Sequence, residues 1–126
     1  MEQRYLADTN TIIDYLGNKL PKESLRLIDG IDIFLSVISR IELLVWKNAT
    51  EDYLNFLNDF IDTSTVFGLT EPIILKSIEI RKTYRLKLPD AIIAATAVTN
   101  NLTLLTRNLS DFKKIAQLNC IDPYQV

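Results

Sequence analysis

The residues best suited to chemistry are four carboxylates, Asp8, Glu42, Asp90 and Asp111. Asp8, Glu42 and Asp111 each follow a short apolar segment with the character of a β-strand. The carboxyl ends of parallel strands meet at one edge of a sheet, where ligands bind in such folds. Carboxylates gathered there repel one another unless a cation neutralises them. The spacing therefore predicts a site for Mg²⁺ or Mn²⁺, the hard cations that oxygen ligands favour.

The amino acids that the chain lacks narrow the remaining chemistry. It has no histidine, a single cysteine and only three glycines, which stand far apart. This composition excludes a Ser-His-Asp triad, a Cys-His pair, histidine-based acid–base catalysis and an ordinary His/Cys zinc site. It also excludes a Walker loop and a G-x-G-x-x-G turn. If the protein is an enzyme, we expect a carboxylate-held cation to activate water for hydrolysis.

Each carboxylate also has a structural interpretation. Asp8 fits the N-cap of the helix that follows it, and Ser39 with Glu42 has the S-x-x-E pattern of a capping box. Asp90 and Asp111 stand at expected helix starts, where a carboxylate complements the helix dipole. Capping explains each residue separately, but it gives no reason for three of them to follow strand ends. Both interpretations stay open at this stage.

The apolar periodicity predicts strands alternating with helices. We expect strands at residues 5–7, 31–37, 65–67, 102–106 and 120–121. We expect helices after Asp8, between Pro21 and Gly30, after Ser39, over 53–61, from Thr70 to about Arg85, over 91–98 and after Ser110. The alternation predicts an α/β fold with a central, mainly parallel sheet and helices on both faces. We expect one domain over residues 1–126.

Size and charge limit the function further. At 126 residues and 48% hydrophobic content, the chain can build one core, in which we expect Cys120 to lie. We find no secretory signal and no apolar run near the ~20 residues of a membrane span, so we expect a cytoplasmic protein without membrane association. A net charge of −2 argues against duplex binding through basic surface alone. RNA binding beside a metal site remains possible, because the metal adds positive charge.

Four segments carry a resemblance to a known family. They are Asp8-Thr9-Asn10, S-V-I-S-R-I-E-L at 36–43, P-D-A-I-I-A-A-T-A at 89–97 and L-T-R-N-L-S-D-F at 105–112. In this order they resemble the successive motifs of PIN-domain ribonucleases of the VapC type. The resemblance implies a PIN fold and an Mg²⁺- or Mn²⁺-dependent endoribonuclease. It also implies that the four carboxylates bind the metal, with Asn108 as an alternative or supporting fourth member.

The same resemblance implies further roles and partners. Thr9, Asn10 and Thr106 are expected to support the carboxylates or orient the substrate, and the family implies a homodimer and a cognate antitoxin that blocks the cleft. The protein would then be the toxin of a toxin–antitoxin pair. From the residues themselves, Arg107, Lys113 and Lys114 are candidates for holding an RNA backbone, and ordinary solvated charge is the alternative.

Rival functions fit less well. A haloacid-dehalogenase-like phosphohydrolase needs a second acid two residues after the first, where this chain has Asn10. A receiver domain needs an aspartate at the end of a central strand, whereas Asp59 and Asp62 lie in a helix-periodic stretch. A non-catalytic RNA- or partner-binding protein of the PIN fold remains the alternative. Trp46 and the stripe over 53–61 are expected to serve either the core or an interface with a second copy or an antitoxin.

Overall fold

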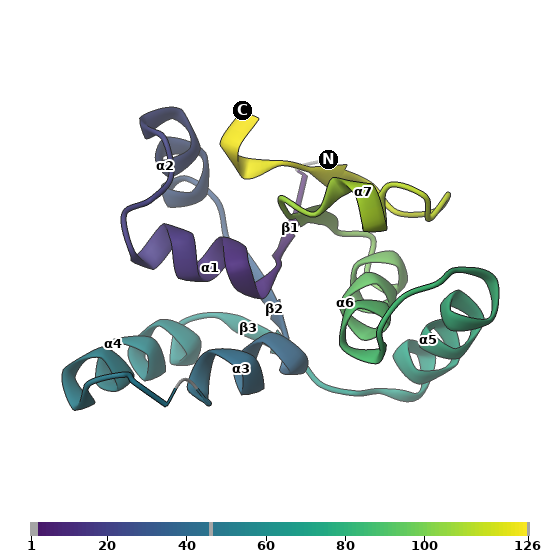
Figure 1. Cartoon of the computed structure of the whole chain (residues 1–126), viewed down its shortest axis with the longest axis horizontal. Helices are drawn as coiled ribbons and strands as arrows, with labels where there is room; N and C mark the ends of the chain where they lie inside the picture. Colours follow the sequence, from purple (N-terminus) through teal and green to yellow (C-terminus); the bar gives the residue numbers. More distant parts are fainter. Residues whose placement is uncertain (1–2, 46, 126) are drawn as a thin grey trace.

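Five parallel strands form one sheet in residues 3–45 and 47–125, the part of the chain that the computed structural model describes (Figure 1). The strands are β1 (Tyr5–Ala7), β2 (Ile33–Ser36), β3 (Thr65–Phe67), β4 (Thr103–Leu105) and β5 (Cys120–Ile121). Their order across the sheet is β3-β2-β1-β4-β5. In the central strand, Leu6 pairs with Phe34 on one side and Leu104 on the other. All the strand pairs are parallel, which confirms the α/β class.

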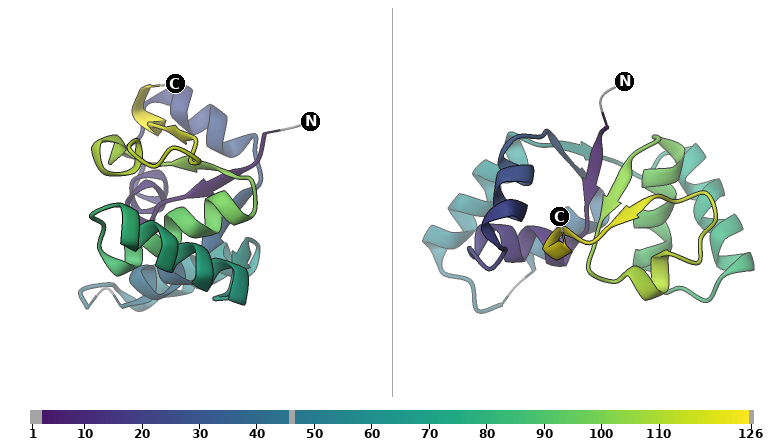
Figure 2. Two further views of the ribbon diagram at one scale, coloured as in Figure 1. Left: turned by 90° about the vertical axis from the view of Figure 1, so that its right-hand side faces the viewer. Right: turned by 90° about the horizontal axis from the view of Figure 1, so that it is seen from above.

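Helices cover both faces of this sheet (Figures 1 and 2). They are α1 (Thr9–Leu16), α2 (Lys22–Asp29), α3 (Val37–Leu44), α4 (Glu51–Asp62), α5 (Glu71–Thr83), α6 (Leu88–Thr99) and α7 (Leu109–Phe112), and a 3₁₀ turn, η1 (Pro123–Gln125), follows β5. Figure 1 shows α5 and α6 on one side of the strands, with α1, α2 and α4 on the other. The expected two-sided covering is confirmed.

The core is divided by the sheet, and alternation along β1 distributes its side chains between the two faces. Leu6 packs in the cluster that α5 and α6 form, whereas Tyr5 and Ala7 pack in clusters on the opposite face. Helix α6 is buried over residues 91–97, as expected from its nearly uniform apolar character. This buried helix fixes the position of Asp90 in its first turn.

The start of α3 corrects two expectations. Strand β2 ends at Ser36, and Val37 already belongs to α3, so the expected strand over 31–37 was too long at both ends. Ser36, not Ser39, caps the helix, because the Ser36 Oγ accepts a hydrogen bond from the Ile38 N–H at 3.1 Å. The capping-box prediction for Ser39 and Glu42 was therefore wrong. Ser39 lies inside the helix with a fully buried side chain.

Other boundaries shift by a few residues. Helix α7 follows Asn108, so Ser110 lies within it and is not its N-cap. In α4, Leu57 and Ile61 are buried as core, while Phe56 is 51% exposed. The stripe over 53–61 therefore supplies core residues and one exposed aromatic ring. Trp46, assigned to the same possible interface, lies outside the described residues.

The burial of Cys120 and the length of the helices bear on two further expectations. Cys120 is half-buried in β5 beside the core of α5 and α6, and this burial raises the pKa of its thiol to about 11. The helices within residues 3–45 and 47–125 all fall short of the length and apolar character that a bilayer span requires.

Candidate active site

Asp8 occupies the point where the strand order of the sheet reverses. It follows β1, and its Oδ2 accepts a hydrogen bond from the Thr106 hydroxyl, just after neighbouring β4, at 2.9 Å. Its Oδ1 accepts from the Thr9 N–H at 2.8 Å, which makes Asp8 the N-cap of α1. In open α/β sheets this crevice at the carboxyl ends of the strands is the usual ligand site. Asp8 is thus both a cap and a carboxylate aimed at that crevice.

Glu42 is tied to Asp8 through Thr9. The Thr9 hydroxyl donates to Glu42 Oε1 at 2.6 Å and lies 2.9 Å from the Ser39 Oγ. Thr9 itself is buried whereas Glu42 is exposed, so this contact between α1 and α3 is partly shielded from water. Thr9 therefore fixes two carboxylates: its backbone binds Asp8 and its side chain binds Glu42.

Asp111 is linked to Asp8 on the other side. The Asn108 side-chain amide donates to Asp111 Oδ2 at 2.9 Å, and the Asn108 N–H donates to the Thr106 Oγ1 at 3.0 Å. A hydrogen-bonded chain thus runs from Asp8 through Thr106 and Asn108 to Asp111. Asn108 and Asp111, weighed as alternative fourth members, lie together in this chain.

Asp90 joins the other three carboxylates electrostatically. Burial is the main cause that raises the pKa of Asp90, followed by the negative charges of Asp8, Glu42 and Asp111, while Lys87 opposes them. Burial also raises the pKa of Asp8, against the hydrogen bonds from Thr106 and Thr9, and the Glu42 charge adds to the rise. Asp8 at the N-cap of α1 and the acids of α3, α6 and α7 therefore lie close enough for their charges to interact.

The donor set suits a hard cation, because these groups are carboxylate oxygens supported by hydroxyl and amide groups. Burial, with repulsion from neighbouring acids added to it, raises the pKa values of Asp8 and Asp90, and a bound cation would favour their charged forms. Within residues 3–45 and 47–125, however, no three acidic or cysteine side chains converge tightly enough to hold one ion. Ligation by three of the acids would require side-chain rotation toward a common point.

A profile comparison decides the family. Residues 5–118, which include all four carboxylates, match the PIN domain. The chain belongs to the PIN-domain family. Strand β5 and η1 lie beyond the matched segment, although β5 pairs with β4 in the same sheet.

Solved structures include close relatives of this PIN domain in shape. A chain of a toxin–antitoxin complex from Klebsiella pneumoniae is 29% identical with a TM-score of 0.79, over 97% of this chain and 99% of that one. DNA-bound VapBC from Salmonella typhimurium is 26% identical with a TM-score of 0.80, over the same shares. VapBC-1 from nontypeable Haemophilus influenzae is 23% identical with a TM-score of 0.81, over 96% of this chain and 98% of that one, and this likeness concerns the fold alone. A comparison with curated proteins gives no match.

The remaining expected site residues of this PIN domain lie around the carboxylates. Asn10 is exposed in α1. Arg107 is exposed, and its guanidinium carbon lies 4.1 Å from the centre of the Tyr124 ring, whose hydroxyl donates to Asp14 Oδ2 at 2.8 Å. This support for Arg107 could not be predicted from the sequence, because Asp14 and Tyr124 belong to α1 and η1 and no local pattern joins them.

Proposed function

We propose that this PIN domain is a divalent-metal-dependent endoribonuclease and the toxin of a toxin–antitoxin pair. The observation that carries the proposal is that hydrogen bonds link Asp8 to both Glu42 and Asp111 at the carboxyl ends of the strands, and that the charges of all three act on Asp90. The likeness to chains of toxin–antitoxin complexes supports the biological class. The same proposal includes a cytoplasmic location, where RNA is available.

In this proposal the four carboxylates hold Mg²⁺ or Mn²⁺. A divalent cation held there would supply a water molecule of lowered pKa, and hence hydroxide near neutral pH. Thr106 and Thr9 orient the two oxygens of Asp8, and Thr9 also orients Glu42. Asn108 holds Asp111 in the same way. These neutral hydrogen-bond donors fix the carboxylates without supplying a positive charge that would compete with the cation.

The proposed substrate is an RNA phosphodiester bond. Attack by external water, rather than by the ribose 2′-hydroxyl, leaves a 5′-phosphate and a 3′-hydroxyl. No histidine is required for this reaction, which agrees with the composition of the chain. Asn10 and Arg107, both exposed beside the site, are proposed to orient the RNA.

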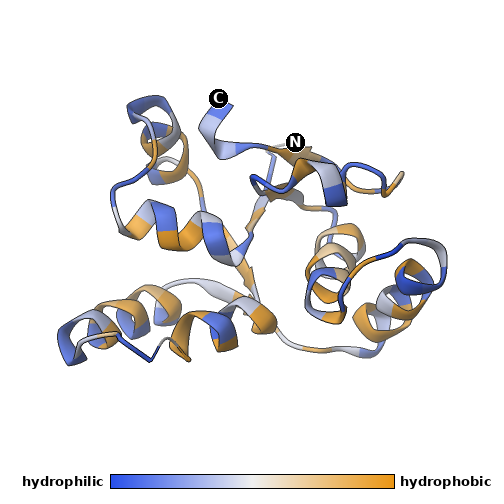
Figure 3. Ribbon diagram, viewed as in Figure 1, coloured by the Kyte–Doolittle hydropathy of each residue, from blue (hydrophilic) through white to orange (hydrophobic). Residues whose placement is uncertain are grey.

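The proposal also includes two protein partners. Exposed apolar residues Ile13 and Val45 line a pocket of about 370 Å³ together with Glu42, and we assign this surface to the antitoxin. A second exposed apolar surface, formed by Leu75, Ile78 and Leu88 on α5 and α6, is assigned to a second copy of the chain in a homodimer. Figure 3 shows apolar segments in α3 and α5 alike.

The test is Mg²⁺-dependent cleavage of RNA by wild type, Asp8→Asn and Asp59→Asn. Asp59 is exposed in α4, so Asp59→Asn makes the same chemical change away from the site. We expect Asp8→Asn to lose cleavage and Asp59→Asn to retain it. Circular dichroism should show that both variants are folded. Activity that persists in Asp8→Asn, or in wild type with excess chelator, would contradict the proposal. Wild type that binds RNA without cutting it would instead favour the non-catalytic alternative.

A further inference from the structure

Cations border the acidic site in two segments. Arg85 and Lys87 lie in the turn between α5 and α6, and Lys113 and Lys114 directly follow α7. All four side chains belong to exposed residues. We call these four residues the basic rim. The chain as a whole has a net charge of −2, so this concentration of positive charge is a local feature.

Direct contacts join the two segments of the basic rim. The Lys114 Nζ donates to the Arg85 carbonyl oxygen at 3.1 Å, and the Ala116 N–H donates to the Tyr84 hydroxyl at 3.4 Å. These bonds fasten the α5–α6 turn to the segment after α7. The four cations therefore belong to one continuous surface and do not lie on two independent loops.

The basic rim adjoins the candidate active site along both segments. Lys87 stands three residues before Asp90, and its charge acts on that carboxylate. Lys113 stands two residues after Asp111, whose charge also acts on Asp90. A strand of RNA bound at the basic rim would therefore pass beside the carboxylates.

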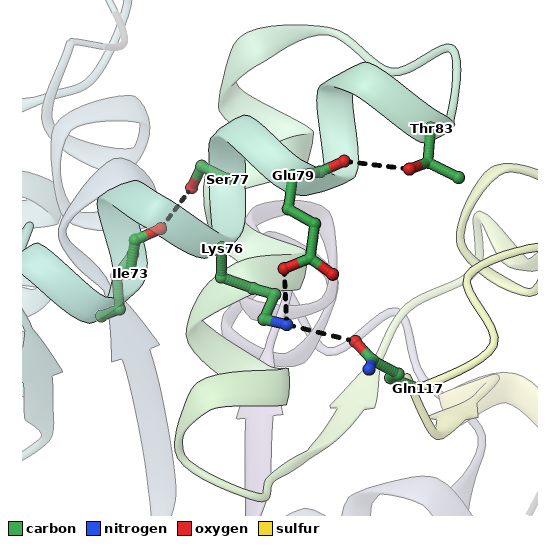
Figure 4. A network of polar contacts seen from close by, with 6 residues as sticks. All are labelled: Ile73, Lys76, Ser77, Glu79, Thr83 and Gln117. Atoms are coloured by element: carbon green, nitrogen blue, oxygen red, sulfur yellow. Dashed lines mark hydrogen bonds and ion pairs between the residues drawn. The ribbon is translucent and has the colours of Figure 1, made fainter.

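Nearby carboxylates do not neutralise the basic rim. Glu79 of α5 binds the Lys76 Nζ at 2.9 Å, and that ammonium also donates to the Gln117 Oε1 at 3.4 Å (Figure 4). In the described part of the chain the ion pairs are Lys76 with Glu79 and Arg26 with Glu23. Neither pair includes a rim residue, so no ion pair within the described residues holds the charges of the basic rim.

Fold stability does not account for Lys87 of the basic rim. Arg81 and Lys82 lie in the last turn of α5, where positive charge stabilises the helix dipole. Lys87, in contrast, is the N-cap of α6 and makes no side-chain capping bond. Asp, Asn, Ser and Thr are preferred there, and a cation at that end opposes the dipole. A lysine at a helix N-cap that makes no capping bond therefore indicates a role in binding and not in stabilising the fold.

We propose that the basic rim binds the phosphate groups of single-stranded RNA on one side of the cleavage site and so sets the path of the strand. The identity of this ligand rests on the proposed nuclease function. Lysine and arginine contacts to phosphates position a strand without reading its sequence. The basic rim also offsets the repulsion between RNA and the acidic site before a cation binds.

The test measures binding separately from cleavage, with every variant made on an Asp8→Asn background. Fluorescence anisotropy of an unstructured, labelled single-stranded RNA is followed over a series of KCl concentrations. The rim variant combines Arg85→Gln, Lys87→Gln and Lys113→Gln, and leaves Lys114 in place because it braces the turn. The control combines Lys19→Gln, Lys22→Gln and Arg26→Gln, which remove the same charge from exposed residues in and beside α2.

Each phosphate contact on a single strand contributes about 0.7 to the slope of log K against log salt. We therefore expect the rim variant to lose about 2 from this slope and at least about tenfold in affinity at low salt. The control should keep both, and thermal unfolding should show all proteins folded. The proposal would be overturned if the rim variant bound RNA as tightly as the Asp8→Asn protein, or if the control lost as much affinity as the rim variant. It would also be overturned if the protein bound no RNA, or if it bound polyglutamate in place of RNA.

The outcomes also separate this inference from the nuclease proposal. Wild type that cleaves RNA while the rim variant binds normally would refute the role of the basic rim alone. Wild type that fails to cleave, while RNA binding still depends on the basic rim, would refute the nuclease and keep the basic rim as an RNA-binding surface.

Discussion

Asp8 has two roles at the end of β1, and they do not exclude each other. Its Oδ1 caps α1 through Thr9, while its Oδ2 lies in the crevice and accepts from Thr106. Burial raises the pKa of Asp8, so its ionised form is costly in the folded protein without a cation. Under the proposed function, stability at this residue would therefore be coupled to metal binding.

Asp90 allows this coupling to be measured. Burial and three neighbouring acids raise its pKa in the folded state above the ordinary 3.8, so the folded protein binds more protons than the unfolded chain in that interval. Metal-free stability should then fall as the pH rises from about 4 through the raised pKa. Asp90→Asn should remove part of this fall and raise the metal-free Tm at pH 7 by about a few degrees.

The measurement is thermal unfolding with chelator and with Mg²⁺ over a pH series. Wild type should gain stability from Mg²⁺ at pH 7, and Asp90→Asn should gain much less. If Asp90→Asn lowers the metal-free Tm at pH 7 instead, Asp90 acts mainly as a helix-dipole partner and its ionised form is not strained.

Only part of the candidate site could be read from the residues. The positions of Asp8 and Asp111 after strands were evident from the apolar pattern. The link from Thr9 to Glu42 was not, because it depends on how α1 and α3 cross in space. The support of Arg107 by Tyr124 was hidden for the same reason.

Strands and helices were easier to predict than their ends. The strands at 5–7, 65–67 and 120–121 were predicted with the observed bounds, because each is a short apolar run between turns. The start of α3 was predicted three residues late. Ser36 and Ser39 both precede apolar residues, and only the backbone turn after β2 decides which serine caps the helix.

The cap of α3 gives a prediction for this element. Ser36→Ala should remove the hydrogen bond to the Ile38 N–H and cost about 1 kcal/mol of unfolding free energy. Urea unfolding of the purified variant measures this loss. A cost within experimental error of zero would mean that the helix needs no cap at Ser36. Thr50→Ala, at the N-cap of α4, is a matched control that should cost a similar amount far from the carboxylates.

At the scale of the whole molecule, apolar and charged surfaces are separated around one acidic site. The basic rim borders Asp90 and Asp111, while exposed Ile13 lies on α1 and exposed Ile41 and Val45 lie in α3 and at its C-cap, on either side of Glu42 in the chain. In the proposed function, RNA and a protein inhibitor would thus contact different residues around the carboxylates. An inhibitor seated on the apolar surface could cover Glu42 without displacing the basic rim.

The apolar surface gives the whole-molecule prediction. Val45 is 64% exposed, so Val45→Glu should leave folding and RNA cleavage intact. It should abolish co-purification with the proposed antitoxin when the two proteins are co-expressed, because a buried charge is costly at an apolar interface. Leu75→Glu places the same charge on another exposed apolar residue, in α5, and should retain that complex. Loss of the complex in Leu75→Glu but not in Val45→Glu would place the antitoxin on the other surface.

Anomalous diffraction from crystals grown with Mn²⁺ tests directly whether the distant carboxylates share one cation. We expect one strong peak bound by Asp8 and at least one of Glu42, Asp90 and Asp111, with their side chains turned toward it. A map without a peak in this crevice, with the four carboxylates still apart at saturating Mn²⁺, would contradict it.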